Sequence, residues 1–222
     1  APTQGPGRLR NDVARALDLP TDRITIHRMF VGGGFGRRWQ TDFGIQAALV
    51  SRAAGMPVKL VWSRTEDLQH DWYRPAMTTA VKAGLTADGH LRGFDVQVSG
   101  ALLSGWGRPA TAPRKPDPQL LGGLQNTPYR LADFRIRWSP HENHVPIGVW
   151  RSVAYSHNVF AVECALDELA RAAGRDPLEF RLELLAHSPR HQRALEAVAR
   201  RAGWGRELPA GEGLGLALGE YG

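Results

Sequence analysis

The order of β-type and α-type patterns along the chain places the strongest constraint on its fold. Residues 77–103 hold two β-like segments around TADGH, in which Asp88-Gly89 is a strong hairpin turn signal. Another strand pattern, LADFRIRWS, follows at 131–139, and the apolar spacing of residues 156–174 then predicts a long helix. Because strands follow strands and helices follow helices, we expect an α+β fold with mixed or antiparallel sheets packed with helices, not a βαβ alternation.

The carboxyl end contains two further helix starts. Asp176-Pro177 and Ser188-Pro189 each place a capping side chain before a proline suited to the first helical position. In the long helix before them, glutamates such as Glu163 and Glu168 have the pattern of ordinary helix residues. The apolar residues predicted to be buried on the three helices are Phe160, Val162, Leu166, Leu169 and Ala173, then Leu178, Leu182 and Leu185, then Leu195, Val198 and Ala202.

The amino-terminal part combines helical and β-type patterns. Residues 8–17 have helical spacing, whereas RITIHRMFV at 23–31 and VKLVWS at 58–63 predict strands. Between these two segments, Thr41 or Asp42 can cap a helix that stops at Gly55. Its predicted inner face consists of Phe43, Ala47, Val50 and Ala54.

A proline- and glycine-rich segment divides the chain. SGWGRPATAPRKPDPQ, residues 104–119, is typical of a long loop or a domain boundary. We therefore expect a first α+β domain at residues 1–105 and a second at 106–222, which is helix-rich at its end and truncated at its carboxyl terminus.

Composition limits the class of protein. No apolar run reaches the roughly 18 to 20 residues that a membrane-spanning helix requires. The single cysteine, Cys164, excludes an internal disulfide framework and a cysteine-built metal centre, and we predict no metal-ligating side chains. The net charge of +6 suits an anionic partner and leaves open a basic, non-enzymatic binding module for nucleic acid or an acidic protein. Because the arginines are spread over the whole chain, a dedicated nucleic-acid surface is not expected.

The segment FVGGGFGRRW, residues 30–39, is the most unusual local feature. Glycine permits positive φ and lets a ligand touch the main chain, and successive amides can point at one anion. One alternative is a tight structural turn between a strand and a helix. Another is a dinucleotide-binding fingerprint, but Arg37 and Arg38 stand where the helix should pack on the sheet, and the expected acidic residue roughly 20 positions later is missing.

Four motifs in order resemble one enzyme family. They are PTQ at residues 2–4, LDLPTDRITIH at 17–27, GGGFGRR at 32–38 and GVWRSV at 148–153. Together they are similar to the molybdenum-binding large subunit of the xanthine dehydrogenase and aldehyde oxidase family, most closely to the isoquinoline oxidoreductase beta subunit branch. The resemblance runs from Thr3 to at least Leu185. It identifies the chain as an internal fragment with a molybdenum-cofactor-binding-domain-like fold.

The resemblance implies a molybdopterin-dependent oxidoreductase that inserts oxygen from water into an N-heterocycle or an aldehyde. The implied cofactor is molybdopterin with molybdenum, expected here as the cytosine dinucleotide. The implied partners are an iron-sulfur small subunit, the remainder of the large subunit and the small-molecule substrate.

The resemblance also implies six cofactor-binding residues, namely Gln4, Gly34, Phe35, Gly36, Arg37 and Arg151. Gln4 matches a glutamine whose amide donates to an oxo ligand of the metal. Gly34, Phe35 and Gly36 match a loop whose backbone amides approach the metal ligands and the pterin, so we expect the glycines to make room for that group. Arg37, together with Arg38, is expected to contact phosphate. Arg151 matches an arginine beside the metal.

The sequence departs from the family at several positions. Trp39, and Ser152-Val153 after Arg151, replace residues that position purines in the xanthine-oxidising enzymes, so purine specificity is not expected. The general-base glutamate is expected beyond Gly222, so we predict no catalytic residue within these residues. We expect the isolated chain to be inactive and to lack the cofactor. Substrate, electron acceptor, oligomeric state and compartment, bacterial periplasm or cytoplasm, stay open.

Overall fold

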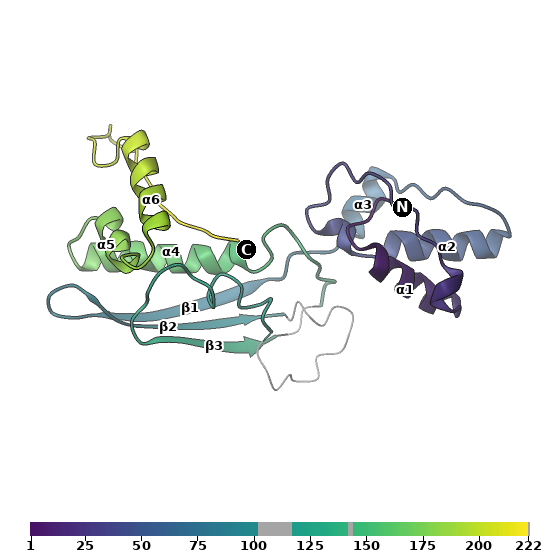
Figure 1. The fold of residues 1–222 in the computed structure, drawn as a ribbon, viewed down its shortest axis with the longest axis horizontal. Coiled ribbons are helices and arrows are strands. Elements are labelled where there is room, and N and C mark those ends of the chain that lie inside the picture. The colour runs from purple at the N-terminus through teal and green to yellow at the C-terminus, as the bar shows by residue number, and fades with distance from the viewer. Residues whose placement is uncertain (102–116, 142–143, 222) are drawn as a thin grey trace. The chain divides into compact units, whose positions relative to one another are not determined.

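A computed structural model of the protein describes residues 1–101, 117–141 and 144–221 (Figure 1). The described residues form two compact units, one of residues 1–75 and 144–151 and the other of residues 76–101, 117–141 and 152–221. The domain boundary predicted between residues 105 and 106 lies outside the described residues, as does most of the predicted loop at 104–119. The predicted domain division therefore stays a prediction.

The second unit is built on a three-stranded mixed sheet. β1 (Met77–Leu85) and β2 (Leu91–Gly100) form an antiparallel hairpin, and β2 also pairs in parallel with β3 (Phe134–Pro140). Gly89 has a φ of 82°, a conformation that glycine permits, and the predicted turn joins the two strands. All three predicted strands of this unit are confirmed.

Helices cover one face of this sheet. α4 (Tyr155–Ala172) packs against β1 and lies along the sheet in Figure 1, and α5 (Pro177–Leu184) and α6 (Pro189–Ala202) follow it. Phe94, Val96 and Val98 on β2 are buried in one cluster with apolar residues of the helices, among them Val162, Leu166, Phe180 and Leu195. This layer of helices on a mixed sheet confirms the predicted α+β class. Three residues that were predicted to be buried are exposed, namely Phe160 (69% exposed), Val198 (52% exposed) and Ala202.

The two helix caps predicted at the carboxyl end have different outcomes. The carboxylate of Asp176 accepts hydrogen bonds from the N–H groups of Leu178 at 2.8 Å and Glu179 at 3.1 Å, so this cap is confirmed. The Ser188 side chain makes no capping hydrogen bond. Its hydroxyl lies 2.6 Å from Nδ1 of His191 instead, so this cap was predicted wrongly.

A buried charged cluster joins α4 to α5. The fully buried Arg181 donates from Nε to Oε2 of Glu163 at 2.9 Å and from Nη2 to the Glu163 carbonyl oxygen at 2.9 Å. Its Nη1 lies 2.7 Å from Oδ1 of Asp167. Burial raises the pKa of the Glu163 carboxyl, although the positive charge of Arg181 acts in the opposite direction. Glu163 is therefore part of the core and not the ordinary helix residue that its pattern predicted, whereas Glu168 is exposed.

The first unit is helical. α1 (Pro6–Leu17) confirms the predicted first helix and packs against α2 (Asp42–Ala54), and the short α3 (Arg64–Gln69) follows. The two helices approach closely at Gly44, where an added Cβ would lie 2.4 Å from Cδ1 of Leu9. This contact differs from the predicted inner face of α2, because Val50 and Ala54 are exposed.

The two strands predicted in the first unit are absent. Residues 24–31 and 58–63 belong to no strand, and the only β-pairing among the described residues of this unit is an isolated bridge between Tyr73 and Ile147. β-branched residues favour extended backbone, but a strand also needs a neighbour to bond to.

The helices in the described part of the chain include none with the length and apolar character that a membrane span requires.

Candidate functional site

The glycine loop leaves several main-chain donors free. Gly32, Phe35 and Gly36 have positive φ values of 72°, 49° and 93°, and the loop closes through a hydrogen bond from Arg37 N–H to the Gly34 carbonyl oxygen at 2.8 Å. No acceptor in the described part of the chain receives the N–H groups of residues 32–35. Phe35 is 64% exposed, so the loop is open to solvent and is not packed into an apolar interior. Such a run of free amides can bind an anion or an oxygen-rich ligand.

Gln4 lies directly against this loop. Its Oε1 accepts a hydrogen bond from Gly36 N–H at 3.1 Å, and its own main-chain N–H donates to the Arg38 carbonyl oxygen at 2.9 Å. An added Cβ at Gly34 would lie 2.4 Å from Oε1 of Gln4, so only glycine leaves space for the amide at this position. The exposed Gln4 uses its oxygen within the chain, and its Nε2 has no acceptor among the described residues.

The segment that precedes Arg151 supports the loop from another side. An added Cβ at Gly36 would lie 2.3 Å from the Val149 carbonyl oxygen and 3.1 Å from Cα of Trp150. Gly34 and Gly36 thus make room for other parts of the chain, and the approach of a ligand to these two glycines stays a prediction. Arg151 itself is exposed, and its guanidinium forms no ion pair with any described residue.

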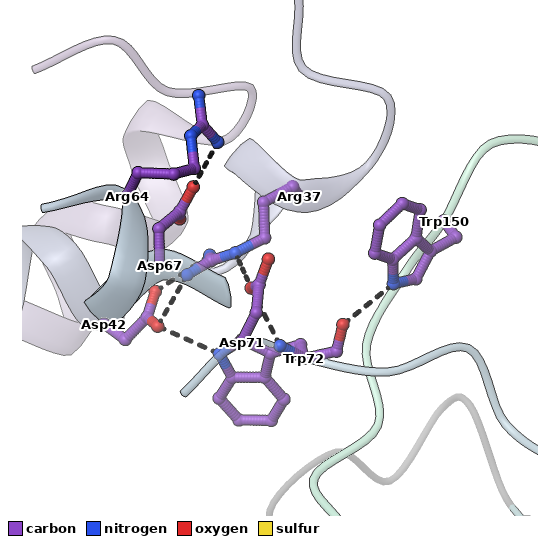
Figure 2. Close-up of polar contacts among 7 residues, drawn as sticks. All are labelled: Arg37, Asp42, Arg64, Asp67, Asp71, Trp72 and Trp150. Carbon is purple, nitrogen blue, oxygen red and sulfur yellow. Dashed lines mark hydrogen bonds and ion pairs between the residues drawn. The ribbon is translucent and has the colours of Figure 1, made fainter. Parts of the chain in front are cut away.

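Arg37 is held by two carboxylates, as Figure 2 shows. It donates from Nη1 and Nη2 to the two oxygens of Asp42 at 3.1 and 3.0 Å, and its Nε pairs with Asp71. Burial lowers the pKa of the Arg37 guanidinium, but hydrogen bonds and charges from Asp42 and Asp71 outweigh burial and raise it. Both edges of the guanidinium face carboxylates, so the geometry does not support the predicted phosphate contact of Arg37. Arg38 lies over the Phe43 ring, 5.0 Å from its centroid.

Two tryptophans extend this network toward Arg151. Trp72 Nε1 donates to Oδ2 of Asp42 at 2.9 Å, and Trp150 Nε1 donates to the Trp72 carbonyl oxygen at 2.9 Å (Figure 2). Asp71 also accepts from Trp72 N–H at 2.8 Å. The network therefore connects the end of the glycine loop, the start of α2 and the segment before Arg151. Sequence reasoning missed Asp42, Asp71 and Trp72 as supports of the loop, because no motif or spacing in the sequence links them.

Residues 1–185 match the family model of the molybdopterin cofactor-binding domain. The chain belongs to this family. The predicted resemblance and the predicted molybdenum-cofactor-binding fold are thereby confirmed.

The chain is also similar to individual proteins. The chain is 32% identical to isoquinoline 1-oxidoreductase subunit beta of Brevundimonas diminuta, with 98% of the chain and 28% of that protein covered. It is also 32% identical to a Gluconacetobacter polyoxogenes protein named membrane-bound aldehyde dehydrogenase (pyrroloquinoline-quinone), with 92% of the chain and 30% of that protein covered. Quinoline 2-oxidoreductase from Pseudomonas putida 86 has the same fold, with a TM-score of 0.69 at 20% identity over 91% of the chain and 28% of that structure.

The chain thus spans less than a third of the length of these relatives. The alternative of a basic, non-enzymatic module finds no support in them. Of the six predicted site residues, the structure brings Gln4, Gly34, Phe35 and Gly36 together, and it places the backbone before Arg151 against Gly36. Among the described residues, no group of three or more His, Cys, Asp or Glu side chains is arranged to hold a metal ion.

Proposed function

We propose that Gln4 and the loop of residues 32–36 bind the pterin-held molybdenum of an oxidoreductase acting on an N-heterocycle or an aldehyde. The orientation of the Gln4 amide carries this proposal. Because Oε1 accepts from Gly36 N–H, the amide nitrogen is the atom left to interact with a ligand. The free N–H groups of residues 32–35 lie in the same loop, so side-chain and main-chain donors are available together.

These residues fit the group that the family binds. An oxygen-rich metal complex needs donors, and the loop supplies uncharged N–H groups that require no change of protonation state. When bound, the cofactor would supply the two-electron chemistry that transfers oxygen from water to the substrate. Gln4 would donate from Nε2 to an oxygen of the complex, and the amides of residues 32–35 would orient it. Arg151, whose guanidinium forms no ion pair with a described residue, would supply a positive charge.

Arg37 has a different role in this proposal. Since Asp42 and Asp71 occupy its guanidinium, Arg37 fixes the end of the loop and does not bind the cofactor tail. The cofactor would be molybdopterin in its cytosine dinucleotide form, and its phosphates would be bound by other residues of the longer subunit. We further propose that the subunit works with an iron-sulfur small subunit. The subunit designation in the name of the isoquinoline relative supports a multi-subunit enzyme.

The test uses the longer subunit, produced together with its small-subunit partner. Molybdenum is measured by mass spectrometry, and the pterin is released, oxidised and measured by fluorescence, with the nucleotide identified by mass. Gln4→Ala should lower the retained cofactor on the order of tenfold, the effect of losing one strong hydrogen bond. Gln125→Ala, an exposed glutamine in the second unit, is the control and should retain it. A folded, partnered preparation with neither molybdenum nor pterin would contradict the proposed function.

A further inference from the structure

A small cavity in the second unit lies beside the buried charged cluster of Arg181. Tyr129, Glu163 and Leu218 are among the residues that line it. Its volume is about 10 Å³, which is close to the minimum that one ordered water molecule requires. Tyr129 and Glu163 are only 4% and 5% exposed, so bulk solvent does not hydrate their polar atoms.

Two buried side-chain atoms at this cavity lack a hydrogen-bond partner in the described part of the chain. They are Oη of Tyr129 and Oε1 of Glu163. Because Oε2 of Glu163 accepts from Arg181, Oε1 is the carboxylate oxygen that needs a donor. Burial and the neighbouring Glu163 carboxyl raise the pKa of the Tyr129 hydroxyl, so this group keeps its proton and can donate. A buried donor and a buried acceptor are thus both unpaired, which is unfavourable.

The segment that follows α6 supplies a second donor. Leu218 packs against the hydrophobic core of this unit, and its main-chain N–H acts on the Glu163 carboxyl to lower the pKa. Among the residues that the structure describes, this N–H has no acceptor in hydrogen-bonding geometry. Two donors and one acceptor, from three separate parts of the chain, are therefore available at one cavity.

We propose that this cavity binds one ordered water molecule that links Tyr129, Glu163 and Leu218. The water would accept from Tyr129 Oη and Leu218 N–H and would donate to Glu163 Oε1, and three such bonds are typical of a buried water. The Leu218 N–H and the nearby Arg181 guanidinium disfavour a metal cation at the same place. The bound water would tie the segment around Leu218 to α4. The inference does not depend on the proposed enzymatic function, because it concerns the core of the second unit alone.

High-resolution crystal structures of the protein and of two variants test the proposal. The wild type should show one water peak within hydrogen-bond distance of Tyr129 Oη and Glu163 Oε1. Tyr129→Phe removes one of the three partners without adding bulk and should abolish the peak. Tyr221→Phe is the matched control, because it removes the hydroxyl of a tyrosine that is 66% exposed in the same unit, and it should retain the peak.

Amide hydrogen exchange, followed by NMR, gives a second measurement in solution. Leu218 N–H should exchange at least about tenfold faster in Tyr129→Phe than in Tyr221→Phe, because the first variant loses the water that accepts from it. Equal exchange in the two variants would overturn the proposal. A wild-type structure in which Tyr129 Oη bonds directly to Glu163 Oε1, with no water between them, would overturn it even if Tyr129→Phe failed to fold.

Discussion

Gly36→Ala is the sharpest test of how the glycine loop is held. Gly36 has a φ of 93°, and an added Cβ would lie 2.3 Å from the Val149 carbonyl oxygen. Positive φ costs an L-residue about 1–2 kcal/mol, and forcing a methyl group into a filled space costs about 1–3 kcal/mol more. The free energy of unfolding should therefore fall by about 2–5 kcal/mol.

Gly32→Ala provides the matched control in the same loop. Gly32 has a φ of 72°, but nothing lies within 4 Å of an added Cβ, so only the conformational cost of about 1–2 kcal/mol applies. The gain from restricting the unfolded chain is the same for both substitutions and cancels in the comparison. The difference between the two variants then measures the contact with Val149.

Urea unfolding followed by tryptophan fluorescence gives both free energies by linear extrapolation. We expect Gly36→Ala to be less stable than Gly32→Ala by about 1–3 kcal/mol. A difference below about 0.5 kcal/mol, within the usual spread of surface substitutions, would show that Gly36 does not pack against the segment before Arg151.

Two further predictions concern charged groups. Asp71→Asn should lower the free energy of unfolding by about 1–3 kcal/mol, because the Arg37 side chain is only 15% exposed and loses a charged partner. Asp67→Asn, which breaks the exposed pair with Arg64 seen in Figure 2, should change it by less than about 1 kcal/mol in the same urea titration. Equal losses would contradict the support role of Asp71. In the second unit, burial acts to raise the pKa of Glu183, but hydrogen bonds from His90 and Arg175 outweigh it and hold the pKa below the ordinary 4.5. Glu183 therefore stabilises the folded state above pH 4.5, and this stabilisation is lost as the pH falls through the lower folded-state pKa. The difference in free energy of unfolding between the wild type and Glu183→Gln should shrink below pH 4.5. Unfolding curves at several pH values measure this gap, and a gap that is constant with pH would refute the assignment.

The second unit could be predicted from local signals. Asp88-Gly89 fixes a hairpin turn through its own backbone preference, and Asp176-Pro177 fixes a helix start through a cap two and three residues away. These interactions join residues close in sequence, so the sequence alone contains both partners. The burial of Arg181 could not be predicted in this way, because its partner Glu163 lies on another helix, 18 residues away in the sequence.

The strands predicted in the first unit failed for a related reason. The pattern of residues 24–31 predicts extended backbone, and Ile24 has it. The pattern contains no information about a neighbouring strand. Among the described residues, the backbone bonds of this segment at its far end go to Ala1. A local pattern can thus be right about backbone conformation and wrong about secondary structure when no described segment pairs with it.

At the glycine loop, a local sequence signal is correct, but the residues that contact the loop lie far away in the sequence. The sequence indicates that something approaches the main chain closely at residues 32–36, and this is correct, but at Gly34 and Gly36 the approaching groups are the Gln4 amide and the Val149 carbonyl. These contacts join positions 30 and 113 residues apart, so no spacing rule could identify them. Because the glycines admit Gln4, they also fix which end of its amide stays free, and the chemistry proposed for the site depends on that end. Glycine here determines how a side chain is presented, and the free amides of residues 32–35 provide the surface on which a ligand can lie.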